Sequence, residues 1–352
     1  MDRKILIQRL QTILPSIGVS RINSIQGYED SGIYVYQSVR PNAEHLVVDS
    51  GKGSCNDEAF ISCAVECIER YTAENCTNQL YYIKKEEVET MLIEHSSTHY
   101  FPNEYECFEG YKWNTKKPVY VPTDLIRYKN NCTQSIDLKT HFAGTTGIGA
   151  HVTLTNAVYS GLDEILERDA IKRAIFSCKI DNKSIMDTNR ILIDWIESKI
   201  GIVELIFHYS PFNFNVVTCQ CQQNELSGGL LSMGAGLNLE DAIKKALLEG
   251  LQTWLMRIAA SRDDWMMASL NIQNQRFSYS DITMSLKEIK DTFKSKKIFK
   301  SKLDFIESFE DLVVVKLKSE KSICPIDVVK VILPNTLQYE QSEMFTGIPR
   351  AL

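Results

Sequence analysis

The 352-residue sequence lacks several features that would place it in common protein classes. Its ten cysteines include no Cys-x-x-Cys pair, which argues against both a zinc knuckle and a disulfide framework and favours buried free thiols. No stretch approaches the roughly 18 consecutive apolar residues that a membrane span requires, and the first twenty residues lack the apolar core of a signal peptide. We therefore expect a cytoplasmic protein that does not span a membrane.

Positively charged residues are also fewer than negatively charged ones. The 39 lysines and arginines are outnumbered by 45 aspartates and glutamates, which gives a net charge of −6. Proteins whose main role is to bind nucleic acid usually carry a basic surface, so we expect no nucleic-acid partner. The 44% of apolar residues and 24% of charged residues are typical of a soluble globular protein with a sizeable core.

The patterns that are present are typical of a mixed α/β (α+β) fold. β-rich runs, such as residues 32–39 and 203–209, alternate with amphipathic helical stretches. Residues 1–21 predict a short amphipathic N-terminal helix whose apolar side chains lie near one face: Ile5, Leu10 and Leu14. No later linker is long or biased enough to mark a boundary, so residues 22–352 are expected to form a single domain.

One pattern occurs three times along the chain. A glycine-containing loop precedes a helix, and the helix carries acidic or amide side chains at positions i and i+3. The first two helices share the frame Ser-x-x-x-Glu-x-x-Glu-Arg at residues 62–70 and 160–168, and the third carries Glu249 and Gln252. The unequal spacing indicates internal pseudo-repeats within one domain rather than a solenoid.

The repeated frame gathers carboxylates on one helix face, because positions i−4, i and i+3 lie together. The residues concerned are Ser62, Glu66 and Glu69 in the first helix and Ser160, Glu164 and Glu167 in the second. Like charges at this spacing repel, so two such helices facing each other need cations between them. Carboxylate oxygens favour Mg²⁺ over zinc, and protein-bound Mg²⁺ usually also takes phosphate oxygens. The repeats thus predict a site for Mg²⁺ and a nucleotide.

Simpler explanations exist for each part of this pattern. A single Glu-x-x-Glu pair is usually a solvated helix face, and Arg70 and Arg168 would then only offset the neighbouring acids. Lys52 in the segment SGKG does not stand in a Walker loop, and the glycines of residues 144–149 do not match a dinucleotide-binding fingerprint. Tight turns explain both glycine runs as well as phosphate contact does. The recurrence of the acidic frame, rather than any single motif, favours a site.

The ordered blocks of the sequence resemble those of the YcaO family. The resemblance rests on Arg40-Pro41 before SGKG, on SCAVECIERY, TNAVYSGLDEILERDA and GAGLNLEDAIKKALLEGLQ, and on VILPNTLQY and GIPRAL, which together extend from about residue 20 to 350. It implies a YcaO-type fold with mixed and antiparallel sheets flanked by helices. It also implies binding of ATP and Mg²⁺ and activation of backbone amides in a ribosomally made precursor peptide.

The resemblance also assigns roles to residues by matching position. The expected magnesium ligands are Glu66, Glu69, Glu164, Glu167 and Glu249. The expected nucleotide contacts are Lys52, Ser62, Arg70, Asn156, Glu249, Gln252 and Arg257. Asn156 belongs to this set because its TNA matches a TNG-like block of the family, with Ala157 in place of the glycine. The expected catalytic residues are Glu66, Glu69, Arg70, Glu164 and Glu167.

For the reaction, the resemblance favours cyclodehydration of Cys, Ser or Thr to thiazoline or oxazoline rings. The chain ends in IPRAL, whereas azoline-forming relatives commonly end in a Pro-x-Pro-x-Pro-like tail. This difference keeps thioamide formation beside a TfuA-type partner as an alternative. A non-catalytic nucleotide-binding scaffold and a metal-dependent hydrolase that works without ATP are further alternatives.

The resemblance implies partners as well. The family blocks begin by about residue 22, so no fused leader-binding domain is expected. A separate leader-peptide-binding protein would then present the precursor peptide, either a ThiF-like protein resembling ubiquitin-activating enzymes or a TfuA-type protein. A homodimer is expected from the trend of the family.

Overall fold

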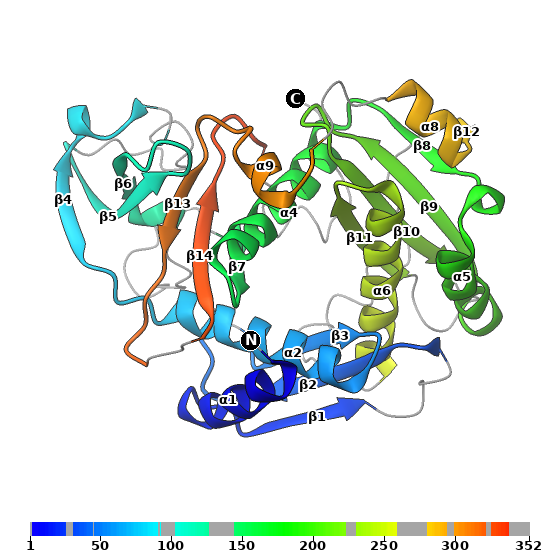
Figure 1. The fold of residues 1–352 in the computed structure, drawn as a ribbon, viewed down its shortest axis with the longest axis horizontal. Coiled ribbons are helices and arrows are strands. Elements are labelled where there is room, and N and C mark those ends of the chain that lie inside the picture. The colour runs from blue at the N-terminus through cyan, green and yellow to red at the C-terminus, as the bar shows by residue number, and fades with distance from the viewer. Residues whose placement is uncertain are drawn as a thin grey trace, which may run out of the picture.

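The computed structural model describes residues 2–25, 31–44, 46–90, 92, 103–126, 144–222, 230–258, 280–293, 299–321 and 325–337. Three sheets with helices packed on them form a mixed α/β fold (Figure 1), which confirms the predicted fold class. Helices long and apolar enough to cross a membrane are absent from these described ranges.

The first sheet is three-stranded and antiparallel. It consists of β1 (Arg21–Ile25), β2 (Tyr34–Val39) and β3 (Val48–Gly53), in that order. The helix α2 (Asn56–Glu74) packs on this sheet, and α1 (Arg3–Ser16) packs on α2.

The N-terminal helix α1 forms where the sequence predicts it. Asp2 caps it, since its carboxylate accepts hydrogen bonds from the backbone N–H groups of Lys4 and Ile5. Its buried residues are Leu6, Leu10 and Leu14, whereas the side chain of Ile5 is 47% exposed. The predicted apolar face was therefore wrong at Ile5, because the i, i+4, i+8 row that meets the core starts one residue later.

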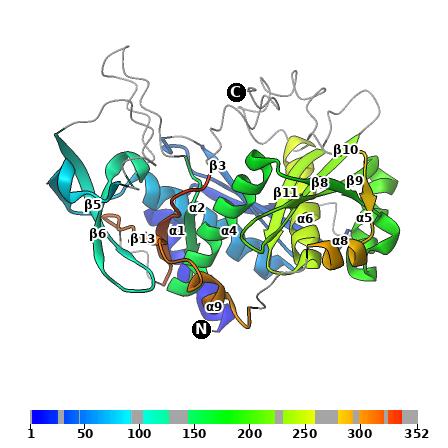
Figure 2. The ribbon, with the colours of Figure 1, turned by 90° about the horizontal axis from the view of Figure 1, so that it is seen from above.

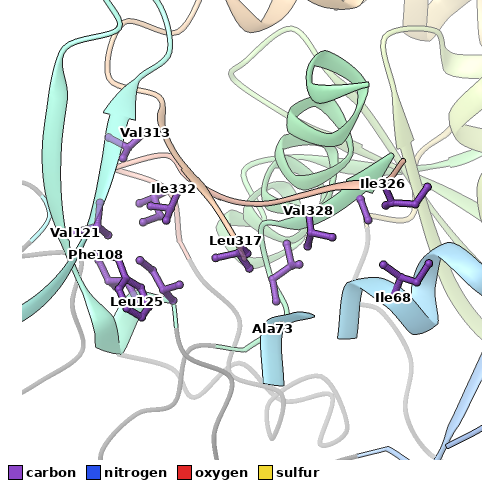
Figure 3. Close-up of a cluster of buried hydrophobic side chains, with 14 of the residues drawn as sticks. Ile68, Ala73, Phe108, Val121, Leu125, Val313, Leu317, Ile326, Val328 and Ile332 are labelled. Carbon is purple, nitrogen blue, oxygen red and sulfur yellow. The ribbon is translucent and has the colours of Figure 1, made fainter. Parts of the chain in front are cut away.

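The second sheet has six strands and lies between two apolar clusters. Its order is β4 (Leu80–Lys84), β5 (Glu104–Lys112), β13 (Val313–Lys316), β14 (Asp327–Ile332) and β7 (Ile148–His151), with β6 (Pro118–Pro122) paired to the other side of β5. Figure 3 shows the cluster on one face, in which Ile68 and Ala73 of α2 belong with Phe108, Val313 and Val328 of the sheet. On the other face, α4 (Leu154–Arg173) packs on β7 and β14.

The third sheet has five strands in the order β11 (Leu230–Gly236), β10 (Asn215–Gln222), β9 (Ile202–Tyr209), β8 (Ser177–Ile180) and β12 (Thr283–Met284). Only the β8–β12 pair among these is parallel. α6 (Leu239–Ile258) packs on β10 and β11, and α5 (Asp187–Lys199) packs on β9. The short elements α8 (Leu286–Thr292), α9 (Lys302–Ile306), η2 (Lys85–Glu87), η3 (Thr123–Leu125) and η4 (Asn182–Ser184) lie in the connections.

Each predicted pseudo-repeat is a strand followed at once by its helix: β3 with α2, β7 with α4, and β11 with α6. The prediction of glycine loops was wrong for the glycines of β3 and β11 and for Gly149 of β7, which lie within strands, whereas Gly144 and Gly147 lie in the loop before β7 as predicted. An added Cβ at Gly51 would lie 1.9 Å from the Cys63 nitrogen, one at Gly149 would lie 2.2 Å from the Ala157 oxygen, and one at Gly234 would lie 2.3 Å from the Ala246 nitrogen. The glycines let each helix pack directly on the strand before it.

The two glycines of β11 allow this explanation to be tested. Replacement of Gly234 by alanine is expected to lower the free energy of unfolding by about 1–3 kcal/mol or more, because the methyl group meets the backbone of α6. The Gly236→Ala variant is the matched control, since the nearest atom to its Cβ is 3.5 Å away. Urea unfolding of both variants measures the effect, and equal stability of the two would contradict the packing role.

The two cysteine pairs with short spacing follow the prediction, whereas Cys55 and Cys76 are only partly buried. The pairs Cys63 with Cys67 and Cys219 with Cys221 are all buried free thiols. Burial raises the pKa of the Cys219 thiol to about 12, which keeps it protonated and unreactive.

Candidate functional site

The acidic faces of α2, α4 and α6 belong to one electrostatic network. Figure 1 shows α4 and α6 between the second and third sheets, with α2 beneath them on the first sheet, and Figure 2 shows the same helices from above. Glu69 of α2 interacts with Glu164 of α4, while Glu249 of α6 interacts with both Glu66 and Glu167. The structure therefore places all five predicted magnesium ligands in one connected set of electrostatic interactions.

Alternate residues of the strand β3 face α2 on one side and α6 on the other. Gly51 lies against α2, whereas Ser50 accepts a 2.5 Å hydrogen bond from the Gln252 amide nitrogen. The ammonium group of Lys52 lies 3.7 Å from a Glu249 carboxylate oxygen. Lys52 and Gln252, which were predicted to contact the nucleotide, thus lie at the same edge of the acidic network.

Arg70 links the first acidic helix to a carboxylate that the sequence analysis missed. It donates a 2.7 Å hydrogen bond to Glu66, and its Nε lies 3.1 Å from Asp49 on β3. The Asp49 side chain is fully buried, and burial raises its pKa even though Arg70 lowers it. Asp49 precedes SGKG in a β-rich run, so period-2 alternation of β3 was the signal that could have placed it toward α2.

On α4, Glu164 is held by an arginine and by the backbone. Arg168 forms a 2.5 Å ion pair with it, and the Gly147 N–H donates a 3.3 Å hydrogen bond to its other oxygen. Arg168 also donates a hydrogen bond to the Thr146 hydroxyl. In this conformation Arg70 and Arg168 therefore offset neighbouring acids, as the simpler explanation predicts.

Two carboxylates of the network have strongly altered acidity. Burial raises the pKa of Glu69 well above its ordinary value, and repulsion from Glu164 and Glu66 raises it further. Burial likewise raises the pKa of Glu167, and Glu249 and Asp163 add to the effect. Ionisation of these two acids in the absence of cations therefore raises the free energy of the folded protein.

This electrostatic cost predicts a pH dependence of stability. A carboxyl group whose folded pKa is raised contributes stability that is fully present below its unfolded pKa and is lost as the pH rises through the folded pKa. In the absence of divalent cations, a Glu69→Gln/Glu167→Gln variant should therefore gain thermal stability over the parent protein as the pH rises from about 5 to about 8.

Thermal unfolding at several pH values measures this difference. The Glu86→Gln/Glu87→Gln variant is the control, because both side chains are exposed and lie outside the network. A difference between the network variant and the parent protein that stays constant with pH would contradict the proposed cost of ionisation.

Lys330 on β14 is a second residue that sequence reasoning missed. Its side chain is buried between Val328 and Ile332 of the same strand, with 3% of the residue exposed, and it donates a 3.0 Å hydrogen bond to the Gly144 carbonyl. Burial lowers its pKa to about 8, while Glu164 and Glu69 favour its charged form. A lysine in the otherwise apolar run VVKVI was the available signal, because such a residue is rarely buried without acidic neighbours.

The donor set fits a hard cation, but its present arrangement does not complete a coordination sphere. Within the part of the chain that the structure describes, no three acidic, cysteine or histidine side chains are grouped closely enough to hold a metal ion. Glu66 and Glu164 are turned toward Arg70 and Arg168 on their own helices. Release from these arginines would free carboxylate oxygens, the ligands that Mg²⁺ prefers.

The remaining predicted residues vary in position. Ser62 and Asn156 lie partly buried on α2 and α4, whereas Ser160 of the second frame is exposed. Arg257 lies in α6, but its side chain is outside the described part of the structure.

Comparison with known proteins agrees with the resemblance seen in the sequence. The family model described as YcaO cyclodehydratase, ATP- and Mg²⁺-binding, matches residues 50–337. The chain belongs to the YcaO family. The predicted family and its ATP and Mg²⁺ cofactors are thereby confirmed, and the match includes all three repeats apart from the first two residues of β3.

Two curated relatives share about a quarter of their residues with this YcaO protein. An uncharacterized protein of Methanothermobacter thermautotrophicus is 26% identical over 91% of this chain and 90% of its own length. An uncharacterized protein in the tfuA 3′ region of Rhizobium leguminosarum bv. trifolii is 25% identical over 72% of this chain and 65% of its own length.

Solved structures share the fold. YcaO from Methanopyrus kandleri, bound with AMPPCP and Mg²⁺, superposes with a TM-score of 0.76 at 21% identity and covers 100% of this chain and 96% of its own. A heterocyclase in complex with substrate and cofactor gives a TM-score of 0.75 at 14% identity, over 96% of this chain and 52% of its own. At these identities the likeness establishes the YcaO fold of this chain.

Proposed function

We propose that this YcaO protein uses ATP and Mg²⁺ to activate backbone amides of a ribosomally made precursor peptide. Membership of the YcaO family over residues 50–337 carries the proposal. The convergence of three acidic helices in one network supports the location of the site. Bound ATP would supply the phosphoryl group that converts an amide oxygen into a leaving group, and bound Mg²⁺ would neutralise phosphate charge.

The chain's own residues would bind and orient the reactants. The carboxylates of Glu66, Glu69, Glu164, Glu167 and Glu249 would hold Mg²⁺. Lys52, Ser62, Arg70, Asn156 and Gln252 would contact the nucleotide, together with Arg257. Because Arg70 and Arg168 pair with Glu66 and Glu164 in this conformation, they would be displaced toward phosphate oxygens, for which guanidinium groups have matching geometry.

Cyclodehydration to azolines is the reaction we favour. A Cys, Ser or Thr side chain of the peptide loses its thiol or hydroxyl proton and adds to the preceding carbonyl carbon. The former carbonyl oxygen takes the phosphoryl group of ATP, with release of ADP, and departs as phosphate, and loss of the amide proton leaves a C=N bond in the ring. An amide resists such attack and its oxygen leaves poorly, so positioning and charge neutralisation are the main contributions of the protein. The heterocyclase structure with the same fold supports this choice.

Thioamide formation is the second candidate reaction. One observation favours it, since a relative that covers 72% of this chain is described by its place in the tfuA 3′ region. In this reaction a sulfide donor replaces the carbonyl oxygen, which again departs as phosphate. The partner would then be a TfuA-type protein, whereas azoline formation would use a ThiF-like leader-binding partner. A homodimer and a location in the cytoplasm belong to the same proposal.

Mass spectrometry of a candidate precursor peptide, incubated with the protein, its partner, ATP and Mg²⁺, tests the function. Loss of one water per modified residue indicates azolines, and exchange of oxygen for sulfur indicates a thioamide. Phosphate release that depends on the peptide should accompany either product. ATP consumption without any change in peptide mass would favour the nucleotide-binding scaffold, and peptide turnover without ATP would favour the hydrolase.

A further inference from the structure

A depression of about 500 Å³ lies on the second sheet, away from the acidic helices. It forms where β4 and β13 run beside the same edge of β5. The β4 register ends at Phe108 and the β13 register begins at Tyr111. Among the residues that the structure describes, Glu109 and Gly110 therefore have register partners only on β6. We call this depression the β5 notch. The side chains that line it include Tyr81, Glu109, Tyr111, Lys116, Lys316 and Lys318.

The side chain of Asn78 joins the strands that border the β5 notch. The Asn78 amide nitrogen donates a 2.8 Å hydrogen bond to the Lys316 carbonyl, and its oxygen accepts a 2.8 Å hydrogen bond from the Lys318 N–H. These two bonds tie the start of β4 to the end of β13. The β5 notch is therefore formed by ordered strands, as expected of a largely pre-formed site.

The β5 notch is basic within an acidic protein. It contains three lysines against one glutamate, although the whole chain has a net charge of −6. Lys316 is neutralised by a 2.5 Å ion pair with Asp327. Lys116 and Lys318 form no ion pair with any residue that the structure describes. Glu307 favours the charged form of Lys116 without forming an ion pair with it. The ammonium groups of Lys116 and Lys318 can therefore both pair with a ligand that carries at least two negative charges.

Lys116 is held in an unfavourable backbone conformation. Its φ of 56° lies in the left-handed region, which costs a non-glycine residue about 1–2 kcal/mol. Its ammonium group lies 3.7 Å from the centroid of the Trp113 ring and 5.1 Å from that of Tyr111. The left-handed φ belongs to the turn between β5 and β6, in which the Lys116 N–H donates a 2.9 Å hydrogen bond to the Lys112 carbonyl. The cation–π contacts place the charge beside the β5 notch before any ligand binds.

We propose that the β5 notch binds an extended acidic segment of the peptide substrate, outside the residues that are modified. Lys116 and Lys318 would pair with two carboxylates, and the rings of Tyr81 and Tyr111 would contact the peptide between them. The volume lies within the range of roughly 300–1,000 Å³ found for ligand pockets. This inference rests on the proposed function, since it assumes that the substrate is a peptide.

The position of the β5 notch agrees with this role. β4 and β5 lie at the opposite end of the second sheet from β7, next to which α4 packs (Figure 1). A peptide bound there leaves the acidic helices accessible. Tethering at one site also raises the effective concentration of the rest of the peptide at the other, and this increases turnover without any new contact at the reacting amide.

Fluorescence anisotropy with a short labelled peptide of alternating glutamate and alanine tests the proposal on the full chain. The parent protein should bind this probe more tightly than a matched glutamine–alanine peptide, and added NaCl should weaken binding. The Lys116→Glu/Lys318→Glu variant should bind it at least about tenfold more weakly. The neutral Lys116→Gln/Lys318→Gln variant provides the same test with less disturbance of the fold.

A Lys199→Glu/Lys287→Glu variant is the matched control, because it makes the same charge change at two exposed lysines elsewhere. It should keep parental affinity. Equal binding by the notch and control variants, or no preference for the acidic peptide, would overturn the proposal, as would preferential binding of a labelled single-stranded DNA. Binding of Mg·ATP is measured in parallel and should be unchanged in the notch variants, so that loss of this site is distinguished from failure of the proposed function.

Discussion

Replacement of Glu66 by glutamine is expected to reduce peptide-dependent phosphate release by about a hundredfold or more and to abolish detectable binding of Mg·ATP. Glutamine keeps the shape of the side chain but removes the charge that would face Mg²⁺. Arg70 retains its contact with Asp49, so no buried charge is left alone. The fold should therefore persist, and relief of repulsion from Asp49 and Glu249 should keep the metal-free variant at least as stable as the parent.

Isothermal titration with Mg·ATP and a phosphate-release assay measure this effect. Asp57→Asn is the matched control, since it makes the same carboxylate-to-amide change at an exposed position of α2. Thermal unfolding of both variants confirms that the fold is intact. Unchanged nucleotide affinity in the Glu66→Gln protein would remove Glu66 from the proposed site.

The largest loss of stability is expected from replacement of Arg40, which forms a buried ion pair with Glu74 of α2. Its guanidinium forms hydrogen bonds of 2.5 and 3.1 Å with both carboxylate oxygens of Glu74, and the two side chains are only 3% and 1% exposed. Removal of one partner leaves a buried charge without its counterion. Arg40→Ala should therefore lower the free energy of unfolding by about 3–5 kcal/mol.

A double-mutant cycle separates the pair from its surroundings. Replacing both partners by apolar residues, in Arg40→Met/Glu74→Leu, should recover much of the loss, because no unpaired charge remains. The exposed ion pair between Arg190 and Asp194 is the control, and Arg190→Ala should cost less than about 1 kcal/mol. Urea unfolding provides the measurement, and a double variant as unstable as Arg40→Ala would contradict this account.

The proposed nucleotide site is built mainly from residues that recur in the sequence at helical spacing. Because Glu66 and Glu69 share a helix face, and Glu164 and Glu167 share another, a local rule was sufficient to select them. The same rule could not find Asp49 or Lys330. These residues join the network from strands, and their distance from the helices along the chain says nothing about their separation in space.

The glycines illustrate the same division. In the sequence, Gly51, Gly149 and Gly234 come shortly before the three helices, and this position predicted that they belong to loops. In the structure each lies within a strand, at the place where the following helix comes closest. Glycine is compatible with a turn and with close packing, and local sequence does not distinguish between these two roles.

The sequence by itself determined the mixed α/β class and the three acidic helices, because these follow from periodicity and spacing. It also determined the YcaO family, because its ordered motif blocks resemble those of the family. Tertiary structure alone decided which carboxylates repel one another and which arginines hold Glu66 and Glu164. It also decided that Lys330 is buried and that Lys116 and Lys318 lie beside one notch. The physical reason is that charge interactions and burial depend on distances between segments far apart in the chain, and these distances exist only after the sheets and helices have packed.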